Sequence, residues 1–547
     1  MTLQGAGTCR VLLLTLLLHQ HLQCTVSFPN GTGNTVMFAP YTLVPTSIVP
    51  ESFLSFNFDW NLNQTKIDAW TNASFGWSLD LQNQRLRRLA QALAPANLRI
   101  GGSAADSAVY NEEFVGGIPC PDEVVVNKFC LTPARWDEVI EFADTTGLRI
   151  AFTLNMMAGR CGKPSCGHTG TGPWNSHNAF ALLNYTATKY PNFSNHGFEL
   201  GNELEFNLSP EQTSTALKQL RSMVNQLWPE VHFRPRVIGP DLNPRPDWLA
   251  LMLDGLEPGD LDAITYHMYP GFGRSVDLPD LIPQPGWLDF THQIMSATQR
   301  AVLSQPAGRS AELWIGETAA AWASGTAGVC NGFVSGFWWL DQLGAAASTG
   351  HGAMCRQCLV GGNYTLIDQL EGFKPNPDYW TAWLWRQTMG TKMIAVTQVM
   401  PYEGDFKPET RSYMSCTKIG SPGYKKGAVT MIYLNTGAQN ASILLYQQSR
   451  MQESRRLAVV SSTAAPWGPT PPPFSQLPRL EFVLTPGDES AGLLSRDIAL
   501  NGIILVFGKD MTFPELVGKR GEQENWVVPG KSYGFAVYPE AAAPACM

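Results

Sequence analysis

Short apolar runs alternate with helix-length segments up to about residue 393. Each run has the length of a buried strand, and segments such as 81–93, 133–146 and 210–227 repeat apolar residues at helical spacing. Buried strands that alternate with helices are typical of a parallel sheet, and eight of them predict a closed (β/α)8 barrel, an α/β fold. The predicted strands are residues 53–58, 97–100, 149–154, 197–200, 236–238, 263–267, 312–315 and 353–359.

Beyond residue 393 the pattern changes to short alternating runs separated by glycine and proline. This pattern predicts a smaller C-terminal β-sandwich, with the proline-rich stretch 466–473 as a surface loop inside it. Its expected strands are residues 428–434, 442–446, 479–484, 503–507 and 533–538. The expected domain plan is a signal peptide at 1–27, a segment at 28–50 that joins the sandwich, the barrel at 51–393 and the sandwich at 394–547.

Composition supports a folded chain in two parts. A chain of 547 residues is too long for one ordinary core, and 44% apolar against 15% charged residues excludes a disordered protein. Arg10, the apolar run 11–18 and the small residues of 24–27 predict a signal peptide, because so short a run cannot cross a bilayer. No later run is long enough to span one. We expect a monomer of the secretory route, outside the cell or in the cell wall, lysosome or vacuole; peripheral membrane association stays open.

Glycosylation sequons and cysteines fit an oxidising compartment. Two short cysteine loops are expected to be bridged, Cys120 with Cys130 and Cys161 with Cys166. The pair Cys355 and Cys358 has metal-hook spacing, but no second Cys or His pair follows at a usable distance, so no metal and no cofactor are expected. The sequons begin at Asn30, Asn63, Asn72, Asn184, Asn192, Asn207, Asn363 and Asn440.

The net charge of −8 argues against a protein that holds nucleic acid or highly sulfated polymers by bulk electrostatics. No nucleic-acid partner is expected. An anionic substrate would have to be recognised by local groups.

Two glutamates carry the main chemical signal. Glu203 and Glu317 each follow a short apolar run and a glycine, in Phe-Glu-Leu-Gly-Asn-Glu and Leu-Trp-Ile-Gly-Glu, which places them at the ends of the fourth and seventh predicted strands. Active sites of (β/α)8 barrels lie at that end of the strands, and two facing carboxylates can hydrolyse a glycosidic bond. An isolated Asn-Glu pair would be read as a helix cap, but the second glutamate favours catalysis. We expect Glu203 to stay protonated and Glu317 to stay ionised.

The motifs around these glutamates resemble the heparanase-like glycosidases of glycoside hydrolase family 79, closest to the plant β-glucuronidase branch. The resemblance covers nearly the whole mature chain. It implies that Glu203 is the acid/base and Glu317 the nucleophile, with net retention of configuration. The motifs, in shared order, are Arg-Ile-Gly-Gly-Ser at 99–103, Cys130 with Arg-Trp-Asp-Glu at 135–138, Cys-Arg-Gln at 355–357, Leu-Val-Gly-Gly-Asn-Tyr at 359–364 and Pro-Asn-Pro-Asp-Tyr at 375–379.

The same resemblance implies a substrate-binding set. Asn202 would bind the sugar 2-hydroxyl, and Tyr269 would donate its hydroxyl proton to Glu317. Backbone N–H groups near Gly362, with Tyr364, would hold a uronate carboxylate, so the sequon at Asn363 is expected to stay unused. The remaining implied contacts are Asp59, Ser103, His267, Arg274 and Gln357, and the implied C-terminal disulfide joins Cys416 to Cys546.

The chain also departs from the animal heparanases. Nothing between Asp106 and Arg149 looks excisable, and the stretch 239–248 has one arginine where the animal enzymes carry several basic residues. These departures favour an exo-acting β-glucuronidase over an endo-acting heparanase. The expected substrates are terminal glucuronic acid on arabinogalactan-type glycans, glycosaminoglycan fragments or glucuronidated small molecules, and the sequence does not choose among them. A catalytically inactive carbohydrate-binding relative is the alternative of another class.

Overall fold

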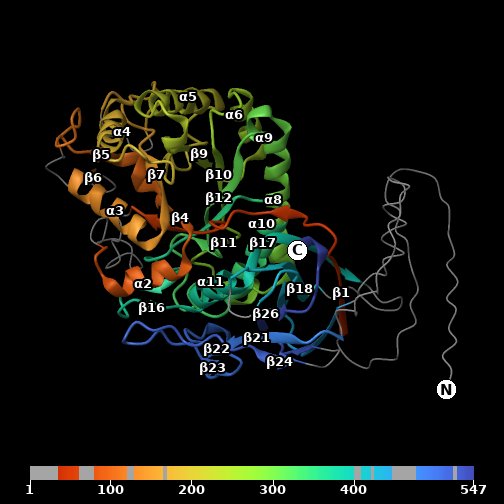
Figure 1. Cartoon of the computed structure of the whole chain (residues 1–547). Coiled ribbons are helices and arrows are strands. Elements are labelled where there is room, and N and C mark those ends of the chain that lie inside the picture. Colours follow the sequence, from red (N-terminus) through yellow and green to blue (C-terminus); the bar gives the residue numbers. More distant parts are fainter. Residues whose placement is uncertain are drawn as a thin grey trace, which may run out of the picture.

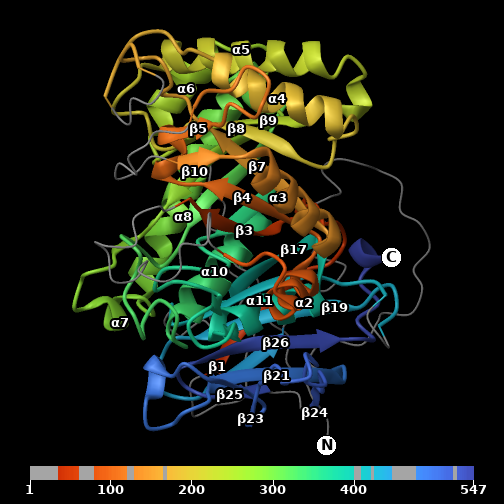
Figure 2. The ribbon, with the colours of Figure 1, turned by 90° about the vertical axis from the view of Figure 1, so that its left-hand side faces the viewer.

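The computed structural model describes residues 35–60, 79–119, 129–163, 169–399, 408–420, 424–445, 476–521 and 526–547. A barrel occupies one end of the molecule and a broad β-sheet the other (Figure 1; Figure 2). The proline-rich stretch 466–473 lies outside the described residues.

The barrel closes through eight parallel strands, which confirms the predicted fold class. All eight match predicted strands within a few residues, although the seventh extends to residue 318 and the eighth ends at residue 356. Its strands in chain order are β3 (Leu54–Asp59), β4 (Ala96–Gly101), β7 (Leu148–Leu154), β8 (Gly197–Leu200), β9 (Arg236–Leu242), β10 (Ala263–Met268), β12 (Glu312–Thr318) and β14 (Ala353–Arg356).

Helices cover the outside of the barrel, and their ends follow local signals. Ser209 and Gln212 form a capping box at the start of α5, and Gly147 ends α3 with a φ of 76° that suits glycine. The main helices are α2 (Gln84–Leu93), α3 (Pro133–Thr146), α4 (His177–Lys189), α5 (Pro210–Leu227), α6 (Pro246–Asp254), α8 (Pro285–Ser304), α10 (Ser335–Ser348) and α11 (Pro377–Thr388). The short helices are α7 (Leu278–Leu281) and α9 (Pro306–Arg309).

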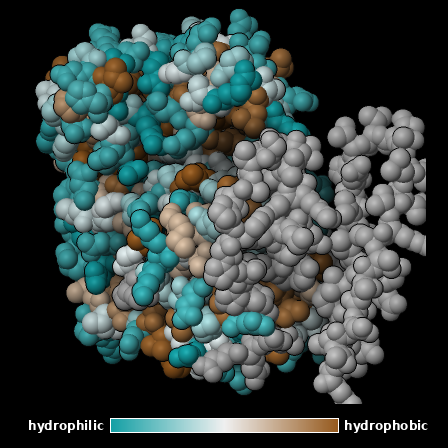
Figure 3. Space-filling model, turned by 45° about the vertical axis from the view of Figure 1, so that its right-hand side comes forward, coloured by the Kyte–Doolittle hydropathy of each residue, from teal (hydrophilic) through white to brown (hydrophobic). Residues whose placement is uncertain are grey.

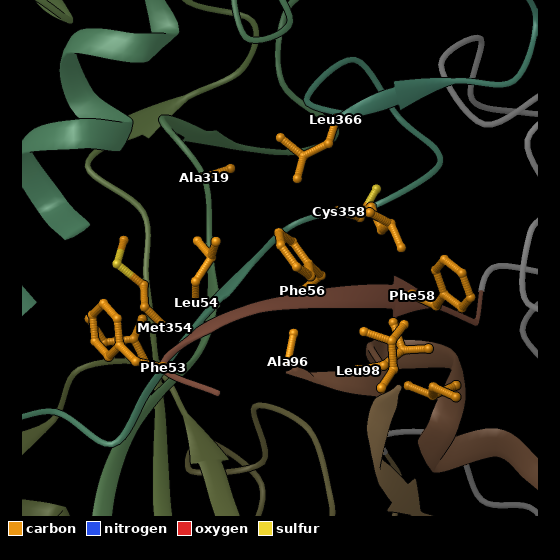
Figure 4. Close-up of a cluster of buried hydrophobic side chains, with 14 of the residues drawn as sticks. Phe53, Leu54, Phe56, Phe58, Ala96, Leu98, Ala319, Met354, Cys358 and Leu366 are labelled. Carbon is orange, nitrogen blue, oxygen red and sulfur yellow. The ribbon is translucent and has the colours of Figure 1, made fainter. Parts of the chain in front are cut away.

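The alternation along β3 explains where polar groups can gather. Leu54, Phe56 and Phe58 pack with Ala96, Leu98 and Met354 in an apolar cluster (Figure 4). Side chains alternate between the two faces of a strand, so the intervening Asn57 and Asp59 face the other way, and the Asn57 amide donates to Gly316 O across the barrel at 3.2 Å. Along β3 the apolar face is covered, and the opposite face brings polar side chains into the barrel.

A long mixed sheet forms the second domain, and the N-terminal strand is part of it. Strand β1 pairs antiparallel with β17 and parallel with β20. The path includes β17 and β18 early in the domain, which were not predicted. Its strands are β1 (Thr35–Tyr41), β17 (Met389–Val399), β18 (Thr410–Thr417), β19 (Val429–Asn435), β20 (Ala441–Leu445), β21 (Arg479–Pro486), β22 (Ile498–Leu500), β23 (Ile503–Ile504), β25 (Trp526–Val528) and β26 (Ser532–Tyr538). Two shorter strands, β2 (Ser47–Ile48) and β24 (Lys519–Gly521), pair with β17 and β21.

A disulfide and a stacked aromatic pair hold the sheet domain. Cys416 and Cys546 are bonded with a Cα–Cα distance of 5.3 Å, the pairing that the resemblance implied. Closing so long a loop stabilises a fold by about 2–4 kcal/mol. Tyr533 of β26 stacks on Phe333 at 4.5 Å between ring centroids and donates to its carbonyl at 3.0 Å. The sheet domain is therefore packed directly against the barrel.

The surface mixes hydrophilic and hydrophobic residues on the face seen in Figure 3. Within the described ranges, no helix has both the length and the apolar character needed to cross a membrane.

Candidate active site

The two predicted glutamates lie at the same end of the barrel. Glu203 follows β8 and Glu317 lies inside β12. The Glu203 backbone has a φ of 55°, and its N–H donates to Asp241 O at 2.8 Å. A left-handed backbone at a non-glycine residue is costly and is often found at functional sites. One imidazole ring lies within reach of both carboxylates: His267 is 2.8 Å from Glu203 Oε1 and 3.9 Å from Glu317 Oε2.

Glu317 accepts strong hydrogen bonds on both oxygens. The Tyr269 hydroxyl donates to Oε1, and Arg99 Nη1 donates to Oε2 at 2.7 Å. Glu317 is only 9% exposed, so these groups take the place of water around it. This is the arrangement that a nucleophilic carboxylate needs.

Arg99 is the centre of the site, and the sequence analysis missed its role. Its guanidinium also donates to Glu199 Oε2 at 2.8 Å, to Asn202 Oδ1 at 2.7 Å and to Asp241. Burial lowers the pKa of Arg99, but the surrounding carboxylates raise it far more, so it stays charged. A charged residue in the middle of a predicted buried strand was the available signal, because buried arginines need acidic partners. Glu199, in another predicted strand, was missed in the same way, whereas Asp241 was missed because the predicted strand stopped at residue 238 and β9 extends to Leu242.

Asp241 and Glu203 hold His267 between them. His267 is fully buried, and its Nε2 lies 2.6 Å from Asp241 Oδ1. Burial lowers the pKa of His267, but the charges of Asp241 and Glu317 raise it well above its usual value. His267 is therefore an imidazolium whose Nδ1–H donates to Glu203.

The expected protonation of Glu203 is corrected by this geometry. Burial raises the pKa of Glu203, but the hydrogen bond and charge of His267 lower it further, and the net shift is downward. The expectation considered only two neighbouring carboxylates and omitted the imidazolium between them. The proton lies on His267, one hydrogen bond away from the Glu203 carboxylate.

A second group of polar residues lies on the β3 and β14 side of Glu317. Gln357 Nε2 donates to Asp59 Oδ2 at 3.3 Å and to the Tyr364 hydroxyl at 3.4 Å. Burial, together with the charge of Glu317, raises the pKa of Asp59 to about 8. A side chain at Gly102, where φ is 91°, would come within 1.9 Å of Asp59 Oδ1. Three implied contacts, Asp59, Gln357 and Tyr364, are thus brought together.

Of the other implied contacts, Asn202 lies in the centre of the site, where its side chain accepts from Arg99 at 2.7 Å. Asn202 is buried, and its backbone N–H donates to Asp106 Oδ2 at 2.9 Å, so Asp106 fixes the residue next to the acid. Ser103 and Arg274 are exposed, and within the described ranges neither contacts the carboxylates. Gly362 has a φ of 66° beside Tyr364.

The structure describes some of the predicted glycosylation sequons. Asn192 and Asn440 are exposed, and Asn184 and Asn207 are half-buried; Asn30, Asn63 and Asn72 lie outside the described residues. The Asn363 amide nitrogen donates to Gly325 O at 3.2 Å, a contact that agrees with an unused sequon.

Cys130 and Cys161 are both disulfide-bonded, while the expected partners Cys120 and Cys166 lie outside the described residues. Cys330, Cys355 and Cys358 are buried free thiols, and the Cys358 thiol donates to Gly361 O at 2.6 Å. Among the residues that the structure places, no three His, Cys, Asp or Glu side chains are arranged to hold a metal ion.

A (β/α)8 barrel with this carboxylate site defines the class of protein: the chain is a glycoside hydrolase. Residues 42–344 match the model of glycosyl hydrolase family 79, N-terminal domain. The match covers more than half of the chain, and the chain belongs to that family.

Relatives extend the match along the chain. Heparanase-like protein 3 of Arabidopsis thaliana is 34% identical over 74% of this chain and 76% of its own length. Baicalin-beta-D-glucuronidase of Scutellaria baicalensis is 29% identical over 82% and 81%, and heparanase of Gallus gallus is 28% identical over 85% and 90%. Among solved structures, the GH51 arabinofuranosidase from Xanthomonas axonopodis pv. citri shares the fold, with a TM-score of 0.60 at 12% identity over 92% of this chain and 100% of that one.

Proposed function

We propose that the protein is a retaining exo-β-glucuronidase that removes terminal glucuronic acid, with Glu317 as nucleophile and Glu203 as acid/base. The observation that carries the proposal is that the Glu317 carboxyl group accepts from Arg99 and Tyr269 while the imidazole of His267 is hydrogen-bonded to Glu203. Glycoside hydrolysis with retention needs one ionised carboxylate and one proton donor on the two sides of the same bond.

The first step consumes this proton. The Glu317 carboxylate attacks the anomeric carbon, the bond to the leaving oxygen breaks, and the proton of the Glu203–His267 pair moves to that oxygen through Glu203. A covalent glycosyl ester on Glu317 results. As Glu317 loses its charge, Arg99 and Tyr269 keep its side chain in place.

The second step restores the pair. Water occupies the position of the leaving group and gives its proton to Glu203, while its oxygen attacks the anomeric carbon and the ester bond breaks. The product keeps the β configuration. His267, hydrogen-bonded to Glu203 throughout, supports the return of the proton.

Recognition of the uronate is assigned to neutral groups. Tyr364, Gln357 and Asp59, whose raised pKa of about 8 keeps it protonated below that pH, can bind hydroxyl and carboxylate oxygens without a cation. This suits an acidic protein that selects an acidic sugar. The catalytic arginine is not free for this task, because its donors are used by Glu199, Glu317, Asn202 and Asp241.

The endo-acting alternative is a heparanase activity, and the relative of that name from Gallus gallus favours it. Against it stands the only arginine of residues 239–248. Arg245 is exposed, lies over the Phe206 ring at 5.0 Å and donates to Glu205 O at 3.2 Å, so this stretch offers a single cation to a sulfated chain. Passage through the secretory route is proposed from the N-terminal sequence alone.

The test compares release of the aryl group from an aryl β-D-glucuronide with shortening of heparan sulfate between pH 4 and 7. We expect aryl release without chain shortening, and product NMR should show the β anomer first. Glu317→Gln should lose the activity, whereas Glu371→Gln, at an exposed glutamate, should keep it. Chain shortening would support the endo alternative, and no activity on either substrate would favour the inactive relative.

A further inference from the structure

Two exposed aromatic side chains lie side by side just beyond the catalytic strands. Strands β11 (Gly271–Phe272) and β13 (Ala321–Trp322) pair in parallel, with Phe272 opposite Trp322. Directly paired residues point to the same face of a sheet. Their ring centroids are 4.5 Å apart with an interplanar angle of 37°, and the side chains are 40% and 52% exposed. We call this pair the aromatic platform.

The backbone beneath the platform is tightly constrained. A side chain at Gly271 would meet the Trp287 ring at 2.6 Å, and Gly273 N–H donates to Trp322 O at 3.0 Å. The next residue, Ala323, has a left-handed φ of 56°. Such a conformation is unfavourable for a residue other than glycine and persists only where its surroundings fix it. The two rings are therefore held in place rather than left on a loose loop.

The platform continues the two strands that deliver Tyr269 and Glu317. Strands rise about 3.3 Å per residue, so Phe272 lies within about 10 Å of Tyr269, and Trp322 within about 17 Å of Glu317. These upper limits keep the platform near the catalytic end of the barrel.

The position of the acid/base Glu203 indicates on which side of the site the leaving group lies. His267 of β10 hydrogen-bonds Glu203, so the end of β10 lies beside the group that protonates the leaving oxygen. Asp59 and Gln357, which are assigned to the uronic acid, come from β3 and the end of β14. We place the leaving group over the end of β10, next to Phe272. The residues after Trp322 reach the Tyr364 side of the site, where Asn363 N–H donates to Ser324 O at 2.8 Å.

We propose that the aromatic platform binds the aglycone of an aryl β-glucuronide by stacking against its flat ring. This subsite rests on the proposed exo-β-glucuronidase function. Residues 270–273 read Pro-Gly-Phe-Gly and residues 320–323 read Ala-Ala-Trp-Ala, so the indole N–H of Trp322 is the one side-chain hydrogen-bonding group in these two segments. A sugar ring carries hydroxyls that need partners around its edge, whereas an aryl ring needs only an apolar face.

The experiment uses glucuronides with matched alcohols. Methyl and benzyl β-D-glucuronide differ by one aromatic ring, and a disaccharide with terminal β-glucuronic acid replaces that ring with a sugar. Trp322→Ala should lower kcat/KM for the benzyl compound about 3- to 10-fold, and Phe272→Ala somewhat less. Both should stay within about twofold of the unmodified protein on the methyl compound. Trp322→Phe should recover most of the loss, and Leu251→Ala, at an exposed apolar residue of α6, should change nothing.

Three results would overturn the proposal in different ways. Equal losses on the methyl and benzyl compounds would mean that the platform shapes the catalytic centre and not an aglycone subsite. A loss on the disaccharide as large as on the benzyl compound would make the platform a sugar subsite. An unmodified protein that hydrolyses no glucuronide would contradict the proposed function itself, and with it this subsite.

Discussion

Two buried clusters of charged residues contain the same residue types but differ in how many acidic and basic groups they hold. The site cluster, at the barrel mouth, comprises Arg99, His267 and Tyr269 with the carboxylates of Glu199, Glu203, Asp241 and Glu317. The interface cluster, where α8 and α10 meet β18, comprises Arg411, His292 and Tyr413 with the carboxylates of Asp289 and Asp341.

The two clusters differ in the ratio of acidic to basic groups and in the pKa values of their carboxyl groups. In the interface cluster, Asp341 accepts from Arg411 at 2.6 Å, from Tyr413 at 2.7 Å and pairs with His292 at 2.8 Å. Burial raises the pKa of Asp341, but Arg411 and His292 lower it to about 2, so its charge is fixed. In the site cluster carboxylates outnumber cations, and burial with the charge of Asp241 raises the pKa of Glu199 to about 7. In the site cluster the pKa of a carboxyl group is therefore raised, whereas in the interface cluster Asp341 stays ionised.

The two arginines give the largest predicted difference. Arg99→Met would leave several buried carboxylates without their cation and Glu317 without a donor, so we expect activity to fall by about 10³-fold or more, with stability lower by about 3–5 kcal/mol. Arg411→Met should cost similar stability because Asp341 stays buried, yet leave kcat/KM of the folded protein within about threefold. Glucuronide hydrolysis and urea unfolding measure the two effects. Equal losses of activity would remove the distinction between the clusters.

The tyrosines sharpen the comparison. Tyr269→Phe removes one donor from the nucleophile, and removal of one such electrostatic donor typically costs about 10²- to 10³-fold in rate. Tyr413→Phe removes one of several donors to Asp341 and should lower stability by about 1–3 kcal/mol without a change in rate. Steady-state kinetics and thermal unfolding of both variants give the answer. A Tyr269→Phe protein with unchanged kcat would contradict the assignment of Glu317 as nucleophile.

The histidines test where the catalytic proton lies. His267→Asn removes the imidazolium that shares its proton with Glu203, so kcat/KM should fall by about 10²-fold and the shape of its pH profile should change. His292→Asn serves as the matched control, because that ring contacts Asp341 and lies away from both glutamates. Its pH profile should overlay that of the unmodified protein. An unaltered profile for His267→Asn would show that Glu203 keeps its proton without help.

The sequence predicted which strand ends form this site better than it predicted the contacts among the site residues. Strand ends were readable because apolar runs stop at glycine, and this placed Glu203 and Glu317 correctly at the barrel mouth. The contacts of Arg99 were not readable, since they depend on which side chains of neighbouring strands share a layer inside the barrel. The interface cluster joins Asp341 to Arg411 across two domains, and no local pattern predicts such a pair. The protonation of Glu203 was misjudged because His267 had no assigned place between the carboxylates.

The smallest predicted effect is a difference in how the clusters respond to pH. The folded pKa of Asp341, about 2, lies below its ordinary value of 3.8, so its stabilisation is present above about pH 4 and is lost as the pH falls toward 2. The shift corresponds to about 2 kcal/mol. The pKa of Glu199 is raised from 4.5 to about 7, so this group lowers stability as the pH rises from 4.5 to 7. The free energy of unfolding should therefore be highest near pH 4 to 5. Asp341→Asn should flatten the acid limb and Glu199→Gln the neutral limb, both measured by urea unfolding. If either substitution flattened the limb assigned to the other, the charge balance inferred for the two clusters would be wrong.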